Sequence, residues 1–146
     1  MQATQTVAVT DANRRSIPER LTMRFVSTRA HGVIDYVYGL VLIAAPYVLG
    51  FSGGGAAQWV SWLVGFTVIG LALLTRFEAG LIRVVPVSAH LAIDVVGGLL
   101  LAASPWLFGF VDQVWLPHVI FGLLEAGLAL VTETTADEDK LASGTA

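Results

Sequence analysis

A 21-residue segment occurs twice in this chain, and each copy is long and apolar enough to cross a membrane as a helix. The first copy runs from His31 to Phe51, and the second runs from His90 to Phe110. The copies align without a gap at an offset of 59 residues, and 11 of their 21 positions are identical. The duplication therefore predicts a chain built from two similar membrane-crossing units.

The composition supports a membrane protein. Only 13% of the 146 residues are charged, whereas a soluble domain carries about 25%. Between Ala30 and Thr75 the only formally charged side chain is that of Asp35. A soluble protein of this size could not cover its surface with so few polar groups. The chain has no cysteine, which excludes disulfides and thiolate chemistry.

The apolar segments predict four membrane spans. We place them at residues 30–49, 57–75, 87–107 and 114–132. The second and fourth spans also match weakly at an offset of 57 residues, and the match includes a threonine at the end of each, Thr75 and Thr132.

The repeated unit is thus a helical hairpin. We predict an all-α membrane protein with a first hairpin at 30–75, a connector at 76–86 and a second hairpin at 87–132. Because each unit crosses the membrane an even number of times, a pseudo-twofold axis along the membrane normal should relate the two.

The two ends of the chain differ in charge. We predict a disordered arm over residues 1–15 and an acidic disordered tail over 133–146. Residues 16–29 are basic and open with a capping-box pattern, which predicts a short helix. That helix either lies on the membrane surface or extends the first span. All eight lysines and arginines lie in residues 1–29, the connector or the tail. The positive-inside rule therefore predicts that both termini and the connector 76–86 are cytoplasmic.

A proline motif lies near the end of each long copy. The second copy contains Ser104-Pro105-Trp106, followed by Leu-Phe-Gly-Phe, and the first copy contains Pro46-Tyr47 at the matching place. Proline tends to end or kink a helix, and an aromatic ring suits the membrane interface. We therefore interpret the motif as a structural helix end with an interfacial anchor.

This tripeptide resembles the signature of the SPW-repeat family of small bacterial integral membrane proteins. The resemblance covers about residues 30–132, and the motif is relaxed in the first copy. It implies a small multi-span helical protein, and the function of the family is uncharacterised. It transfers no catalytic residue to this chain.

Two histidine–aspartate pairs stand at the predicted cytoplasmic ends of spans one and three. His31 and Asp35, like His90 and Asp94, are four residues apart and therefore share one helical face. If the two spans are neighbours, the four side chains could converge. Such a set could bind a divalent metal or pass protons. We favour a structural role, in which each Asp accepts a hydrogen bond from a His and the pairs hold the helices together.

Glu125 has no acidic counterpart, because Val68 is the aligned residue in span two. The hydrocarbon environment favours a neutral, hydrogen-bonded acid at this depth. The alternative is a proton relay through Glu125, between His118 near the outer end and the two aspartates.

The overall prediction is a structural or accessory inner-membrane protein without a recognisable enzymatic activity. No cofactor is expected in that role. The alternative is a metal- or proton-handling protein that uses His31, Asp35, His90 and Asp94 and takes a divalent metal. A third hypothesis, an enzyme acting on a lipid or quinone at the four tryptophans, is weaker because an aromatic belt explains them. The expected partners are the lipid bilayer and either another membrane protein or a second copy. Nucleic acid is not expected, because the basic arm suits anionic headgroups.

Overall fold

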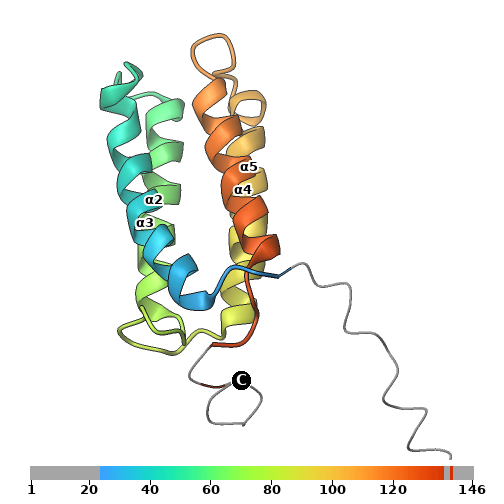
Figure 1. The fold of residues 1–146 in the computed structure, drawn as a ribbon. Helices are drawn as coiled ribbons and strands as arrows, with labels where there is room; N and C mark the ends of the chain where they lie inside the picture. The colour runs from blue at the N-terminus through green and yellow to red at the C-terminus, as the bar shows by residue number, and fades with distance from the viewer. Residues whose placement is uncertain (1–23, 137–138, 140–146) are drawn as a thin grey trace, which may run out of the picture.

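The computed structural model describes residues 24–136 and 139. In this part of the chain it contains four helices: α2 (Thr28–Val48), α3 (Ala56–Leu74), α4 (Val87–Leu107) and α5 (Leu116–Val131). Helices α2 and α3 form one hairpin, α4 and α5 form the other, and the two hairpins pack side by side (Figure 1). The only strand-like pairings among the described residues are two isolated bridges. The all-α prediction is therefore confirmed.

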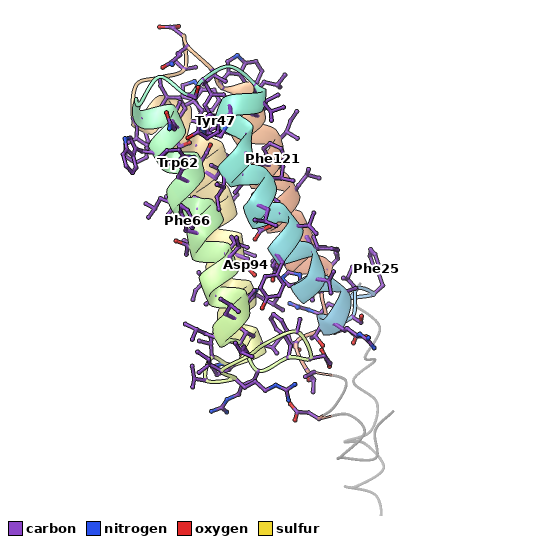
Figure 2. All side chains as sticks on the ribbon, turned by 90° about the vertical axis from the view of Figure 1, so that its left-hand side faces the viewer. Phe25, Tyr47, Trp62, Phe66, Asp94 and Phe121 are labelled. Atoms are coloured by element: carbon purple, nitrogen blue, oxygen red, sulfur yellow. The ribbon has the colours of Figure 1, made fainter. Side chains whose placement is uncertain are left out.

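Three of the helices, α2, α3 and α4, are long and apolar enough to cross a membrane. Helix α5 has 16 residues, which at 1.5 Å per residue is about 24 Å, shorter than the hydrocarbon core of about 30 Å. Apolar side chains such as Leu40, Leu63 and Phe66 are 60–69% exposed on the outside of the bundle, and Figure 2 shows such side chains projecting from its helices. An outer surface of this kind suits hydrocarbon, as expected for a membrane protein.

Close contact between paired helices depends on glycine. A Cβ atom built on Gly39 in α2 would lie 2.8 Å from the carbonyl oxygen of Gly65 in α3. At the equivalent place in the second hairpin, a Cβ on Gly98 would lie 2.5 Å from the carbonyl oxygen of Gly122. Small residues at these four positions thus allow the helices of each hairpin to pack closely. Glycines 70, 97 and 127, in contrast, face open space.

The proline motifs end their helices in the same way. Helix α2 contains Pro46 and ends at Val48. Gly50 follows with a φ of 77°, and the amide of Phe51 donates to the carbonyl of Pro46 at 2.8 Å. In the second copy Gly109 has a φ of 69°, and the amide of Phe110 donates to the carbonyl of Pro105 at 2.9 Å. This is a Schellman ending, which satisfies a free carbonyl and needs glycine at the left-handed position.

The opposite end of each hairpin is held by a short parallel bridge. Val26 pairs with Thr132, and Val85 pairs with Thr75. These bridges place the two threonines directly beside the starts of α2 and α4.

The predicted basic helix over residues 16–29 needs a correction in its described part. Residues 16–23 lie outside the described residues, but 24–27 are not helical. Val26 is used in the bridge, and the Ser27 side chain accepts from the amide of Ala30 at 3.2 Å as the N-cap of α2. The first described helix therefore begins at Thr28, two residues before the predicted span. The predicted arm 1–15, and residues 137–138 and 140–146 of the predicted tail, also lie outside the described residues.

Candidate functional site

The four predicted His and Asp side chains meet in the interior of the bundle. The Nε2 atom of His31 lies 3.4 Å from Oδ1 of Asp35 and 3.3 Å from Oδ2 of Asp94. The Nε2 atom of His90 lies 3.1 Å from Oδ2 of Asp35 and 2.9 Å from Oδ2 of Asp94. Each histidine thus contacts the aspartate of its own helix and that of the other hairpin. We call this closed set of four the His–Asp ring.

Local helix geometry and hairpin packing both position the ring. The i, i+4 spacing brings each His to the Asp of its own helix, and the packing of one hairpin against the other adds the crossed contacts. All four side chains are at most 3% exposed, and the two imidazoles meet edge to face with centroids 5.4 Å apart. Asp94 lies inside the bundle in Figure 2. The predicted convergence of the four groups is therefore what the structure contains.

Two threonines hold the outward-facing nitrogens of the histidines. Nδ1 of His90 lies 2.7 Å from the hydroxyl oxygen of Thr75, and Nδ1 of His31 lies 2.9 Å from that of Thr132. Each hydroxyl donates its own proton to a carbonyl four residues earlier, at 2.7 Å in both cases. A hydroxyl has one proton to donate, so with that proton on the carbonyl each threonine accepts from its histidine. This assignment places a proton on Nδ1 of both histidines.

This arrangement fixes which atom faces the aspartates. A neutral imidazole that is protonated on Nδ1 presents a lone pair at Nε2. In the ring both Nε2 lone pairs would then face carboxylate oxygens, so a positive species must lie between them. Two protons satisfy the ring, and so does one divalent cation. Either choice balances the two carboxylate charges, which matters because uncompensated charge is costly in a membrane interior.

Three of the four ring residues are close enough to one another to share one metal ion. His31, Asp35 and His90 each offer one ligand atom, and these atoms lie within 4.8 Å of one another. Asp94 Oδ2 adds a fourth atom at 3.3 and 2.9 Å from the two nitrogens. Ligand atoms about 2.0–2.1 Å from a tetrahedral zinc ion are about 3.3 Å apart. A His/Asp cluster that could hold a metal is therefore present.

The motif and the repeat have a match among known families. The family model described as SPW repeat domain matches residues 29–132, which include both hairpins and the complete ring. The chain belongs to the SPW repeat family. No curated protein and no solved structure matched it. Within the SPW repeat, the family's proline motif and the ring lie at opposite ends of the hairpins.

The two prolines of the motif are buried, and the aromatic residues that follow them are exposed. Pro46 and Pro105 are buried, and the Ser104 hydroxyl donates to the carbonyl of Leu101 at 2.6 Å. Tyr47 and Trp106 are 61% and 58% exposed. These positions agree with the predicted helix end, and the interfacial anchor stays a prediction.

Glu125 makes no described hydrogen bond to the ring. It is 2% exposed, and within the described part of the chain neither of its carboxyl oxygens has a hydrogen-bond partner. It lines a cavity between α3 and α4 together with Asp94. The expected hydrogen bond to a neutral Glu125 is therefore absent from the described contacts.

His118 occupies the other end of the SPW hairpins. Its Nε2 lies 3.0 Å from the carbonyl of Ala57 and 3.2 Å from the hydroxyl of Ser61, which is its own repeat counterpart. The rings of Phe51 and Phe110 pack against it, with centroids 5.3 and 4.8 Å away. No described hydrogen bond links His118 to Glu125, so the relay through them stays a prediction.

Sequence reasoning missed the role of Thr75 and Thr132. The signal was present, because both threonines recur in the weak match between spans two and four. Threonine is uncharged and common at helix ends, so its type alone did not point to a site.

Proposed function

We propose that this SPW repeat protein holds one divalent transition-metal ion inside the membrane, coordinated by His31, Asp35, His90 and Asp94. The observation that carries the proposal is the fixed orientation of the two imidazoles. Thr75 and Thr132 accept from both Nδ1–H groups, so both Nε2 lone pairs face the two aspartates. Metal-ligating histidines ordinarily donate their other N–H to such an oxygen partner.

The donor set favours ions such as Zn²⁺. Two imidazoles and two carboxylates suit zinc, manganese or iron, and ligand atoms of His31, Asp35 and His90 lie within 4.8 Å of one another. With neutral imidazoles, a divalent ion and two carboxylates sum to zero charge. A neutral centre avoids the cost of about 2.5–3.5 kcal/mol that an insertion scale assigns to a charged Asp at the middle of a span.

Elemental analysis tests the proposal directly. The protein is purified in detergent without chelator, incubated with Zn²⁺ and passed over a desalting column. We expect about one zinc per chain in the wild type, and near-complete loss in the double variant His31→Gln, His90→Gln. His118→Gln is the matched control, because it removes a buried histidine outside the ring. A wild type that retains no more zinc than the double variant would overturn the proposal.

A second candidate is the structural role, in which two protons occupy the ring. It is favoured by the direct hydrogen-bond distances within the ring and by the contacts to Thr75 and Thr132, through which the ring joins all four helices. In that case the protein serves as an accessory to another membrane protein or associates with a second copy. The double variant would then lose stability with no change in metal content. Isolation at native expression with no reproducible protein companion would count against the accessory role.

The proposed location is the bacterial inner membrane, with both termini and the connector 76–86 in the cytoplasm. The support is the distribution of basic residues, since the loops at 50–56 and 108–113 contain no Lys or Arg. The ring then lies toward the cytoplasmic side, and His118 lies toward the outer side.

A further inference from the structure

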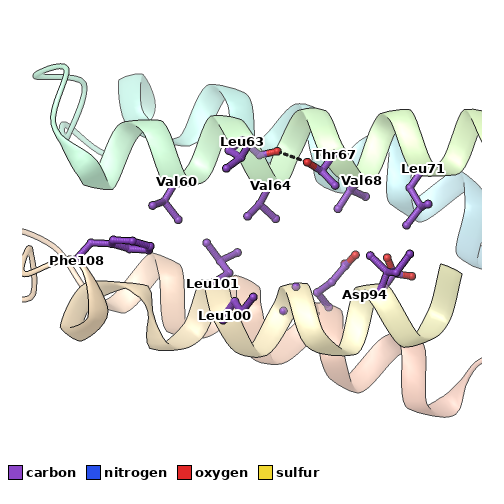
Figure 3. Close-up of a pocket in the computed structure, with 14 residues that line it drawn as sticks. Val60, Leu63, Val64, Thr67, Val68, Leu71, Asp94, Leu100, Leu101 and Phe108 are labelled. Carbon is purple, nitrogen blue, oxygen red and sulfur yellow. Dashed lines mark hydrogen bonds between the residues drawn. The ribbon is translucent and has the colours of Figure 1, made fainter. Parts of the chain in front are cut away.

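A cavity of about 230 Å³ lies between α3 and α4. Its walls are mostly aliphatic, and Figure 3 shows Val64, Val68 and Leu71 of α3 facing Leu101 and Asp94 of α4 across it. Binding sites for small molecules are typically concave, mostly apolar and supplied with a few polar groups. The cavity has that character and lies outside the four-atom centre of the ring.

The cavity lies where the two repeats differ in side-chain size. Tyr38 of α2 fills the equivalent place between α2 and α5, where its hydroxyl donates to the carbonyl of Phe121 at 2.9 Å and its ring packs on Phe121. The repeat counterpart of Tyr38 is Gly97, which lines the cavity and has nothing within 4 Å of a built Cβ. The chain thus fills this groove on one side and leaves it open on the other.

The second departure from the repeat is Glu125. Its counterpart, Val68, is apolar, yet both residues line the same cavity. The Glu125 side chain is 2% exposed, and both of its oxygens are unpartnered in the described part of the chain. A buried polar group without a partner is costly, so a glutamate kept beside an open cavity indicates that something else supplies its partner.

The polar atoms around the cavity are complementary to a hydrogen-bond donor. The Thr67 hydroxyl already donates to the carbonyl of Leu63 at 2.7 Å. Asp94 contributes a carboxylate whose Oδ1 has no described partner, and Glu125 contributes two more oxygens. None of the lining side chains carries a positive charge. We propose that this cavity binds a small hydrophobic amine, which takes up the proton of Glu125 and pairs with its carboxylate as an ammonium, while the apolar part lies against the aliphatic walls.

Binding of a probe amine tests this site independently of the metal. The purified full chain in lipid nanodiscs is titrated with 3-phenylpropylammonium by equilibrium dialysis, and empty nanodiscs give the partition blank. We expect saturable binding, with the uncharged 3-phenylpropanol at least about tenfold weaker because it cannot form the charge-assisted pair. Equal binding of the amine and the alcohol, or binding no greater than to empty nanodiscs, would overturn the proposal. If a lipid acyl chain or a second copy of the chain fills the cavity instead, amine binding will be no greater than to empty nanodiscs.

Repeat-guided variants identify the cavity as the place of binding. Glu125→Gln and Glu125→Val should each weaken amine binding about tenfold or more, and the valine restores the residue of the first hairpin. Gly97→Tyr should block binding by filling the groove as Tyr38 does. Asp112→Asn removes an exposed carboxylate outside the cavity and should leave binding unchanged. Wild-type affinity in folded Glu125→Gln or Glu125→Val protein, checked by circular dichroism, would contradict the assignment. Zinc content should stay at the wild-type value in Glu125→Gln, which separates this site from the proposed metal site.

Discussion

The Nδ1 atom of His90 lies 2.7 Å from the hydroxyl oxygen of Thr75, which closes the hairpin preceding that histidine. The same relationship joins His31 to Thr132 at 2.9 Å. Each bond connects the start of one hairpin to the end of the other. The pair of bonds therefore ties the two repeats together and fixes the face that each imidazole presents to the aspartates.

Removal of one threonine hydroxyl should weaken metal binding without removing a ligand. Thr75→Val keeps the shape of the side chain but leaves the Nδ1–H of His90 without an acceptor. We expect zinc affinity to fall about 10–100-fold, the range seen when a partner of a metal ligand is lost. A competition titration against a chelating dye measures the zinc affinity. Thr75→Ser should retain affinity, and Thr67→Val, a threonine outside the ring, should match the wild type.

Metal uptake should release protons, because the cation replaces the two protons that balance the metal-free ring. We expect about two protons released per zinc, with affinity falling as the pH falls. Isothermal titration calorimetry in two buffers of different ionisation enthalpy gives the number of protons released per zinc bound. A release near zero would show that zinc binds elsewhere, at groups that are already deprotonated.

Close helix contact in the second hairpin predicts a large effect of one methyl group. In Gly98→Ala the new Cβ would lie 2.5 Å from the carbonyl oxygen of Gly122, and backbone must move to admit it. We expect a loss of about 1–3 kcal/mol in the free energy of unfolding, as for other overpacked sites. Unfolding in a detergent-denaturant titration measures the change. Gly127→Ala on α5 is the control, because its Cβ meets open space. Equal effects of the two substitutions would contradict the proposed close contact.

The proposed orientation predicts one-sided labelling. The chain has no cysteine, so single cysteines report without a background. Ser52→Cys lies in the loop after α2, and Leu81→Cys lies in the connector, where Leu81 is 77% exposed. In intact spheroplasts, a membrane-impermeant maleimide should label the Ser52→Cys variant. It should label the Leu81→Cys variant only after the spheroplasts are lysed. The reverse pattern would place the ring at the outer side.

Much of the fold could be predicted from the sequence, because helices and turns depend on residues that are close together in the chain. Long apolar segments between Gly-rich or charged loops specify helices, and the exact offset of the copies specifies two equivalent hairpins. The i, i+4 spacing also placed His31 with Asp35, and His90 with Asp94, on one face before any packing was known. The start of α2 was misplaced, because the pairing of Val26 with Thr132 joins residues 106 positions apart. Helix propensity depends on nearby residues and does not predict such a long-range contact.

The sequence by itself determined an all-α membrane protein of two hairpins with paired His and Asp at one end. Only the tertiary structure decided that the pairs cross between hairpins, that Thr75 and Thr132 orient the imidazoles, and that Gly97 leaves a cavity beside Glu125. The physical reason is that periodicity fixes the face on which a side chain lies, whereas its partners depend on which helices approach closely. Within each hairpin, that approach is set by backbone contact at glycines such as Gly39 and Gly98.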